Sequence, residues 1–538
     1  MSIQGFTPAQ IAAFTTSQIQ SLTTDDFKKL STAQINALTS EQIGAIETED
    51  LSVLSATQIK SFDAQEFADG MLTYQIEALS QTHIAALSTD QLSVLTTDQI
   101  QAIETRDLIK LSAAQLNALS TEQFNNLSSD QIQSLTATQI KGLSTDQLST
   151  LTTDNVQLLT GAQIASLSIT QLNSFDSDQI AAIDVADVAA FTATQVKGMD
   201  SSQIAALTTS QITQLSNNQL AALTTTQIAN IETDDLAAMT SSQIAAFSAK
   251  QIAAFTSDQL NNMTSDQIQV LTAAQIKGLT TDQMSSLTSD NIQLLTSTQV
   301  AALSTTQLNS LDSDQIAALD TEDVAALTAT QIKGLGTDQV VALTTSQAAA
   351  LQYAQIAALS VNQIAVFETD DLAQLSSDNI KALSSLQIRA LTTDQIDSLS
   401  TEQIQGLNAA QIAAMTSEQI STLGTEDIQA LTTAQISALT SEQISGLTTE
   451  HISNLESEDL QALSAIQIKL FNTDQITNGL STTQIQQLTT TQVAALTTDH
   501  IPNLSTDQID ALSTDQVRAL TSDQIAVLTT DQIPYLHF

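Results

Sequence analysis

An apolar residue recurs every eight positions from Phe6 to Leu536, and this spacing constrains the fold more than any other feature of the chain. The repeated unit reads L-[ST]-x-[DE]-Q-[IL]-x-x, as in LSTDQLSV from Leu87. About 66 such octads fill the 538 residues, and only two single-residue insertions, Gly70 and Gly479, interrupt the register; their Asp-Gly and Asn-Gly contexts predict turns. Tandem units this short are typical of a solenoid, in which each unit contacts only its neighbours.

Each octad carries the signals that start a helix. With positions numbered from the apolar residue, position 2 is Ser or Thr, a good N-cap, and position 5 is Gln, which completes a capping box. Positions 1 and 6 have the spacing of a hydrophobic staple, and the acidic position 4 lies in the first turn, where the helix dipole favours negative charge. Pro8 occupies position 3, the first helical position, where its missing N–H does no harm.

One continuous helix is excluded by the same spacing, because eight residues advance about 80° beyond two full turns and the apolar stripe would wind around the helix. The chain is therefore expected to break and restart at every cap. Helices of one to two turns are unstable alone, so each must stack its position 1 and position 6 side chains against neighbouring coils. We predict an all-α, elongated solenoid of very short helices, one per octad.

A β-solenoid is the alternative fold, because Thr and Ile suit strands and short repeats often form them. The spacing between apolar positions, alternately five and three, does not match the period of a strand, and Gly is scarce. Two prolines count against the helical fold: Pro502 and Pro534 lie at position 7, inside the expected turn, so they are interpreted as part of an end cap.

A longer repeat lies above the octad. Lys60, Lys197, Lys333 and Lys469 recur at intervals of about 136 residues, or 17 octads. The whole chain, 1–538, is accordingly predicted to form a single continuous solenoid built as roughly four tandem blocks of about 136 residues each. No linker rich in Pro, Gly or charge separates the blocks, so the repeat is interpreted as a record of gene duplication.

Composition limits the classes of function that this chain can have. The 42% of apolar residues is enough to bury a core, whereas 58 acidic against 14 basic residues give a net charge of −44. No basic stripe exists to bind nucleic acid or an anionic membrane. The N-terminal sequence MSIQGFTPAQIAAF lacks the basic and apolar regions of a signal peptide, and no stretch is long and apolar enough for membrane insertion. Because the chain has no cysteine, the sequence does not indicate whether it works in an oxidising or a reducing compartment.

We predict no catalytic, cofactor-binding or metal residue, and therefore no enzyme. His83, His451 and His500 stand at position 5, where a ring nitrogen can replace the capping Gln, and His537 lies in the tail. They share no ligand spacing. The Ser and Thr residues lie at caps, without a distinctive His or Asp partner set.

Acidic residues are the remaining candidates. A solenoid would set some position 4 acids in rows along one side, and examples are Asp90, Asp98, Glu122, Asp130 and Asp146. A second set replaces the position 5 Gln in locally acidic octads, as at residues 46–50 and 367–371. The prevailing interpretation is helix-start charge and solubility, and the alternative is a string of weak Ca²⁺ sites, which need several converging oxygens.

The run of [ST]-x-[DE]-Q-[IL]-x-x-L units resembles octad arrays in large, acidic, Cys-free bacterial surface proteins, commonly identified as adhesins or haem-utilisation proteins. The resemblance covers essentially the whole chain and implies type I secretion without an N-terminal leader. The glycine-aspartate nonapeptides that usually accompany such proteins are missing, which leaves the secretion route open. No His or Met environment points to haem.

Two functions remain. The first is an extracellular or cell-surface structural or adhesive repeat protein, a stalk, matrix or filament component that binds cell-surface or matrix components or other copies of itself. The second is an intracellular, cytoplasmic scaffold whose groove binds a protein. The scaffold predicts a localised patch of unusual exposed residues, and variable position 7 offers none, since Ala, Ser, Gln, Asn and Lys recur there throughout.

Overall fold

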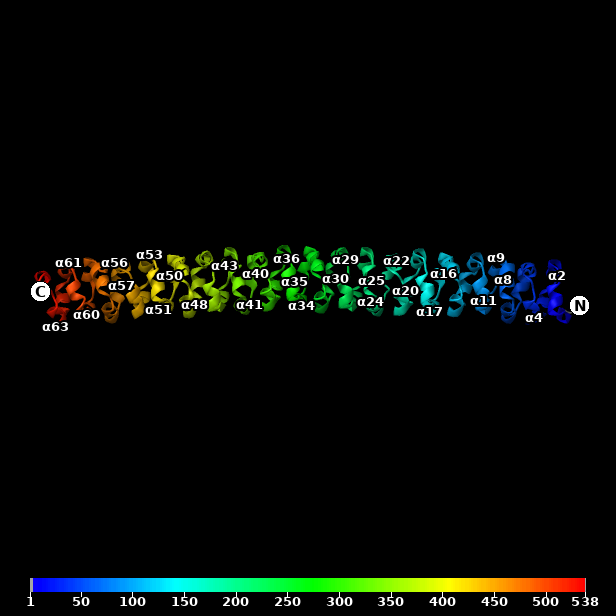
Figure 1. Cartoon of the computed structure of the whole chain (residues 1–538), viewed down its shortest axis with the longest axis horizontal. Coiled ribbons are helices and arrows are strands. Elements are labelled where there is room, and N and C mark those ends of the chain that lie inside the picture. Colours follow the sequence, from blue (N-terminus) through cyan, green and yellow to red (C-terminus); the bar gives the residue numbers. More distant parts are fainter. Residues whose placement is uncertain (1–2, 538) are drawn as a thin grey trace. The chain divides into compact units, whose positions relative to one another are not determined.

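The computed structural model describes residues 3–537, and the regular elements in that range are all helices (Figure 1). The α-helices are four to seven residues long and begin at position 3 of their octads. They run from α1 (Pro8–Ala12) to α33 (Ser265–Gln269) in a first unit, residues 1–271, and from α34 (Ala273–Gly278) to α63 (Ser522–Ala526) in a second, residues 272–538. The predicted short-helix fold is confirmed, and the β-solenoid alternative is wrong.

The predicted caps account for most helix starts. In α55 (Ser441–Gly446), Thr440 is the N-cap: its hydroxyl oxygen accepts the backbone N–H of Gln443, and the Gln443 side chain accepts the N–H of Thr440 at 2.8 Å. Pro8 begins α1, as the first-position rule predicts. Leu447, the next position 1 residue, ends α55 in an extended conformation. Positions 1 and 2 thus form the corner between successive helices.

Three octads complete one turn within each unit, a number that the sequence left open. Helices stack on the third helix along the chain, so that α37 (Ser297–Ala302), α40 (Thr321–Ala326) and α43 (Thr345–Ala350) lie one above another. The intervening helices form the other two sides of the coil. Side chains three octads apart in sequence therefore occupy the same side.

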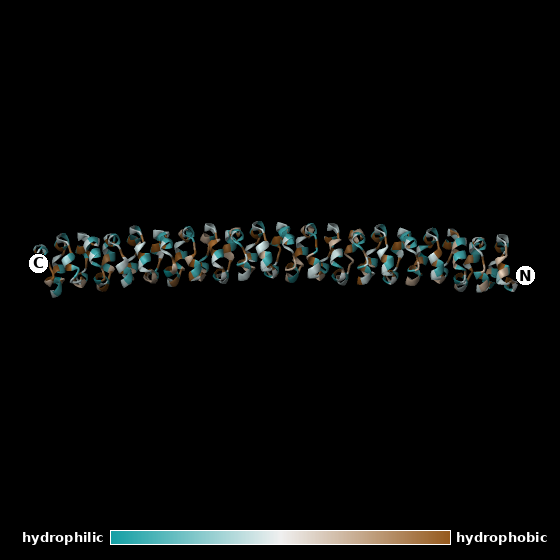
Figure 2. Ribbon diagram, in the orientation of Figure 1, coloured by the Kyte–Doolittle hydropathy of each residue, from teal (hydrophilic) through white to brown (hydrophobic). Residues whose placement is uncertain are grey.

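The core is a thin column of side chains from three positions. Positions 1 and 6 are buried, as predicted, with Leu439 4% and Ile444 0% exposed. Position 5 is buried as well, since Gln443 is only 1% exposed. Figure 2 shows the consequence along the ribbon, where hydrophobic and hydrophilic residues alternate at short, regular intervals. Most octads contribute two apolar side chains and one amide to the interior, so most turns have the same core.

The two inserted glycines lengthen helices and do not form the turns that their Asp-Gly and Asn-Gly contexts predicted. Gly70 ends α8 (Ala64–Gly70), and Gly479 ends a π-helix, η2 (Gln475–Gly479), whose wider turn takes up one extra residue. A Cβ on Gly70 would lie 2.4 Å from the carbonyl oxygen of Ser40, so only glycine fits there. The octads continue in register on both sides of each insertion.

The prolines at position 7 shorten their helices. Pro502 lies in the 3₁₀-helix η3 (Ile501–Asn503), and Pro534 lies in η4 (Ile533–Tyr535). Proline lacks the N–H that an α-helical bond needs, so these octads keep only one tight turn. Their proposed role in an end cap stays a prediction.

Candidate functional site

The position 5 glutamine joins successive turns. The Oε1 atom of Gln443 accepts the N–H of Thr440, and its Nε2 atom donates to the carbonyl oxygens of Ile412 at 2.7 Å and Met415 at 2.8 Å. These carbonyls belong to the preceding turn, 31 and 28 residues earlier. One buried side chain therefore caps its own helix and binds the turn before it. We call this repeated arrangement the glutamine ladder.

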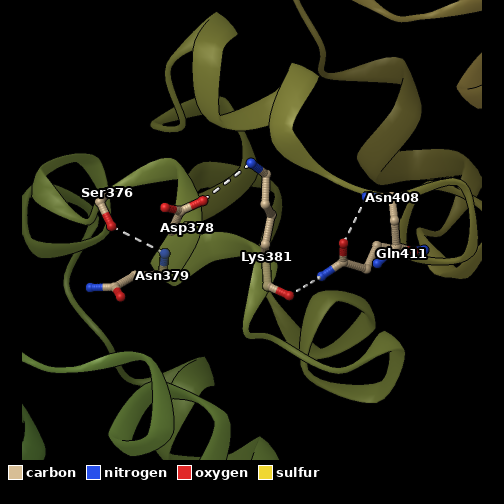
Figure 3. A network of polar contacts seen from close by, with 6 residues as sticks. All are labelled: Ser376, Asp378, Asn379, Lys381, Asn408 and Gln411. Carbon is tan, nitrogen blue, oxygen red and sulfur yellow. Dashed lines mark hydrogen bonds and ion pairs between the residues drawn. The ribbon is translucent and has the colours of Figure 1, made fainter.

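The ladder recurs in both units with the same separations. In the first unit, Gln58 donates to Phe27 and Leu30 at 2.8 and 2.9 Å. Figure 3 shows a variation in the second unit, where the Gln411 amide reaches the carbonyl of Lys381 while its oxygen accepts the N–H of Asn408. Glutamate caps a helix equally well but has no donor for these carbonyls. The near-absence of Glu at position 5 was therefore the sequence signal for the ladder.

Histidine replaces the glutamine in three octads. In His500, Nδ1 accepts the N–H of Thr497 at 3.2 Å and Nε2 lies 2.7 Å from the carbonyl oxygen of Phe471, so the neutral ring carries its proton on Nε2. His83 and His451 bind in the same way. The predicted capping role is confirmed, and the link to the preceding turn was missed. Burial lowers the pKa of His451 and His500.

Aspartate replaces the glutamine in a set of octads that also carry Glu or Asp at position 2, which we call acidic octads. One position 5 carboxyl of this set, Asp187, is half-buried, and the others are almost fully buried: Asp50, Asp107, Asp235, Asp323, Asp371 and Asp459. Desolvation is the main cause that raises the pKa of each almost fully buried carboxyl, and the charges of the neighbouring acids add to it. The pKa of Asp459 rises to about 6, with Glu456 and Glu458 beside it. Sequence reasoning found these octads but did not foresee the burial.

The ladder is broken at acidic octads. Asp323 accepts the hydroxyl of Ser297 at 2.7 Å through Oδ1, while its buried Oδ2 has no hydrogen-bond partner among residues 3–537. The ladder separation of 28 residues, seen between Gln443 and Met415, would place a glutamine amide against the carbonyl of Leu295. No side chain in the described range donates to that carbonyl. The Leu295 carbonyl therefore lacks the amide donor that a ladder glutamine would supply.

The exposed position 4 acids do form rows, as the three-octad turn requires. On one side of the second unit these acids come from α47 (Ser377–Lys381), α50 (Thr401–Gly406), α53 (Thr425–Ala430), α56 (Thr449–Ser453) and the N-cap of η2, elements that stack in that order. The row comprises Asp378, Glu402, Glu426, Glu450 and Asp474. Stacked helices lie about 8–10 Å apart, too far for neighbouring carboxylates to share one cation.

A metal centre finds no support in the part of the chain that the structure describes, where no three Asp, Glu or His side chains converge. Weak Ca²⁺ binding stays a prediction. The ion pairs that basic residues form lie mostly at the surface, as in the Lys381–Asp378 pair at 3.3 Å (Figure 3) and the His537–Asp510 pair at 2.9 Å. Exposed pairs of this kind add little stability.

Asparagine at position 7 forms a second inter-turn contact that sequence reasoning missed. Asn309 donates through Nδ2 to the carbonyl of Gly334 at 2.8 Å and accepts the N–H of Gly336 at 2.9 Å. Asn117 binds Gly142 and Ser144 in the same way. The signal was present as Asn and Gly 25 residues apart, but that spacing has meaning only once the three-octad turn is known.

An open depression of about 630 Å³ lies on the surface of the second unit. Leu386 and Val361, 71% and 43% exposed, lie on its rim, and Lys333 lines one side. As for membranes, none of the helices in residues 3–537 combines the length and apolar character that a bilayer span demands.

Comparison with solved structures gives only remote likenesses. A leucine-rich repeat protein, LegL7 from Legionella pneumophila, matches at 13% identity over 50% of this chain and 77% of its own, with a TM-score of 0.12. Importin13 in its cytosolic state matches at 10% identity over 97% and 84%, with a TM-score of 0.16. Such low scores carry no argument about architecture. No curated protein matches the sequence.

A family model gives a firmer result. The ALTTAQ repeat model matches in tandem along more than half of the chain, at residues 71–102, 100–137, 180–217, 228–265, 262–297, 289–321, 316–353, 364–401, 396–425, 420–455, 478–506 and 503–537. The matched segments are the octads whose caps and ladder are described above. The chain belongs to the ALTTAQ repeat family.

Proposed function

We propose that this protein is an extracellular or cell-surface structural repeat protein, a stalk, matrix or filament component, and not an enzyme. The glutamine ladder is the observation that carries the proposal. It binds each turn to the one before through the same two carbonyls in both units. A repeated mechanical link with little variation suits a spacer, whose length is its function.

The negative net charge supports a role outside the cell in which copies of the protein stay apart from one another. The net charge of −44 and the rows of exposed position 4 acids make the surface of the second unit a polyanion. Copies repel one another unless cations screen them. Such a surface keeps a concentrated structural protein dispersed, and it makes self-association into filaments dependent on ionic strength.

Location is the first test. Intact cells of the source organism are treated with protease, and supernatant, surface and lysate are probed for the full-length chain. We expect the protein in the supernatant or on the surface, where protease removes it, and a deletion strain that attaches to surfaces less than its parent. Complete protection from protease in intact cells would overturn the proposal.

A cytoplasmic protein-binding scaffold is the second candidate, and the depression at Leu386 favours it. A side chain 71% exposed on such a uniform surface is a suitable anchor for an apolar partner residue. This function predicts a protease-protected protein and a partner that is retained by the wild-type chain and lost from a Leu386→Asp variant. Retention by both chains would remove the depression from consideration.

A further inference from the structure

We propose that the acidic octads of residues 272–538 form proton-dependent links between turns, in which a protonated position 5 aspartate donates its hydroxyl to a backbone carbonyl of the preceding turn and an ionised one leaves that carbonyl without a donor. Asp323, Asp371 and Asp459 are the three residues concerned. The inference concerns regulation of the coil itself and holds whether the protein works outside or inside the cell.

The contacts of these carboxyls lack a donor toward the preceding turn. The Oδ2 atom of Asp323 and the Oδ1 atom of Asp371 are buried without partners among the described residues. In the register that joins Gln443 to Met415, the ladder would place an amide against the carbonyls of Leu295, Leu343 and Leu431. No described side chain donates to any of the three. A carboxylic acid restores the missing donor, whereas a carboxylate adds a repulsive acceptor.

No cation faces these carboxyls from the helices packed against them. Asp323 lies between α37 and α43, which carry no titratable side chain, and its own octad adds Asp320 and Glu322. Asp459, in α57 (Ser457–Ala462), lies between α54 (Thr433–Ser437) and α59 (Thr482–Gln487), which are also uncharged. Only the acids of its own octad face it.

The third carboxyl has more acid around it. Asp371, in α46 (Thr369–Gln374), packs against α43 and against α49 (Thr393–Asp397), which brings Asp394 and Asp397 near to Glu368 and Asp370 of its own octad. No lysine or arginine lies on these helices. These helices offer no cation to balance the buried carboxyl, and protonation neutralises it.

The short side chain of aspartate couples its protonation to the spacing between successive turns. Aspartate is shorter than glutamine by one C–C bond, about 1.5 Å, so its hydroxyl approaches the carbonyl of the preceding turn only when the two turns move closer together. Ionisation removes this hydrogen bond, and the carbonyl of the preceding turn is again without a donor. Burial and the neighbouring acids raise the pKa of Asp459 to about 6, so the change falls in mildly acidic solution.

The direction of the effect follows from linkage. A carboxyl whose pKa is higher in the folded state than in the unfolded state stabilises the fold at low pH, and this stabilisation is lost as pH rises through the folded-state value. For Asp459, a shift from 3.8 to about 6 changes the local opening equilibrium about tenfold between pH 5 and pH 7.5. Acid should therefore tighten these turns.

The test is hydrogen exchange by mass spectrometry on the full chain at pH 5 and pH 7.5, after correction for intrinsic exchange rates. The test variant is D323Q/D371Q/D459Q, which restores the ladder amide. The control is E402Q/E418Q/E442Q, which removes three exposed position 4 charges from glutamine octads of the same unit. We expect the wild type and the control to lose about tenfold protection at residues 455–462 on going to pH 7.5, relative to glutamine octads, and the test variant to lose none.

Infrared spectroscopy supplies a second readout that does not depend on exchange. The carbonyl stretch of protonated carboxyl groups should be present at pH 5 in the wild type and reduced in the test variant. An equal pH response of the test variant and the wild type would overturn the proposal. So would a wild type whose acidic and glutamine octads keep the same relative protection at both pH values.

Discussion

Replacing one ladder glutamine with leucine should weaken the coil at a single turn. Gln443→Leu keeps the approximate size of a side chain that is 1% exposed, so overpacking is small. It removes the hydrogen bonds to the Thr440 N–H and to the Ile412 and Met415 carbonyls. All three backbone groups then lie buried against an apolar side chain.

The magnitude follows from those three groups. Each hydrogen bond contributes a net of about 1 kcal/mol, and a buried group left unsatisfied costs about 1–3 kcal/mol. Leucine regains part of this by burying more apolar surface. We therefore expect the free energy of local opening to fall by about 3 kcal/mol, and no helix apart from α55 and its stacked neighbours to change, because solenoid contacts are local.

Hydrogen exchange resolved by octad measures this local free energy, and urea unfolding followed by circular dichroism measures the whole chain. Gln405→Leu, at an exposed position 7, is the matched control and should change opening by under about 0.5 kcal/mol. Gln443→Glu keeps the cap acceptor and loses the donor, so it should be worse than leucine at pH 7.5 and recover toward pH 5. Equal effects of Gln443→Leu and Gln405→Leu would refute the ladder as a source of stability.

Four further outcomes are expected. Gly70→Ala should destabilise the first unit by about 1–3 kcal/mol in thermal unfolding, because its Cβ would meet Ser40, whereas Gly5→Ala, with open space around it, should not. Asn309→Ala should lower local protection by about 1–2 kcal/mol in hydrogen exchange by losing two inter-turn bonds. The lowered pKa of His500 means that stability there is present above its unfolded value of 6.5 and lost as pH falls, opposite in sign to the acidic octads, and His500→Gln should abolish that loss in pH-dependent exchange. Stretching single molecules should release about 70–80 Å of chain for each three-octad turn, and one all-or-none rupture would contradict turn-by-turn opening.

The local structure could be predicted from the sequence because its determinants lie within one octad. The caps at Thr440 and Gln443, the first-turn proline at Pro8 and the buried positions 1 and 6 all depend on residues at most five apart. Their chemistry is that of any helix start. The short helix and its length therefore followed directly from the pattern.

The number of octads per turn could not be predicted from the sequence, because its determinants lie far apart. The Gln443 amide and its two acceptors are separated by 28 and 31 residues. Periodicity of eight is compatible with two or three octads per turn, and only the donor on Gln443 facing Met415 fixes the number. Similar separations hid the pairing of Asn309 with Gly334 and the burial of Asp323. The inserted Gly70 was misread as a turn because its helix end depends on contact with Ser40, far away in sequence.

The relation between the 17-octad block and the three-octad turn bears on which function is favoured. Seventeen octads make five turns and two-thirds, so duplication places equivalent residues on different sides of the coil. Within the first unit Asp50 and Asp187 lie on different sides, and within the second Asp323 and Asp459 do so. A scaffold that binds its partner along one groove needs its binding residues on one side of the coil, and each duplication would place them on another side. A spacer needs only that every octad caps its helix and binds the turn before it, and growth by 17 octads leaves that intact on all three sides.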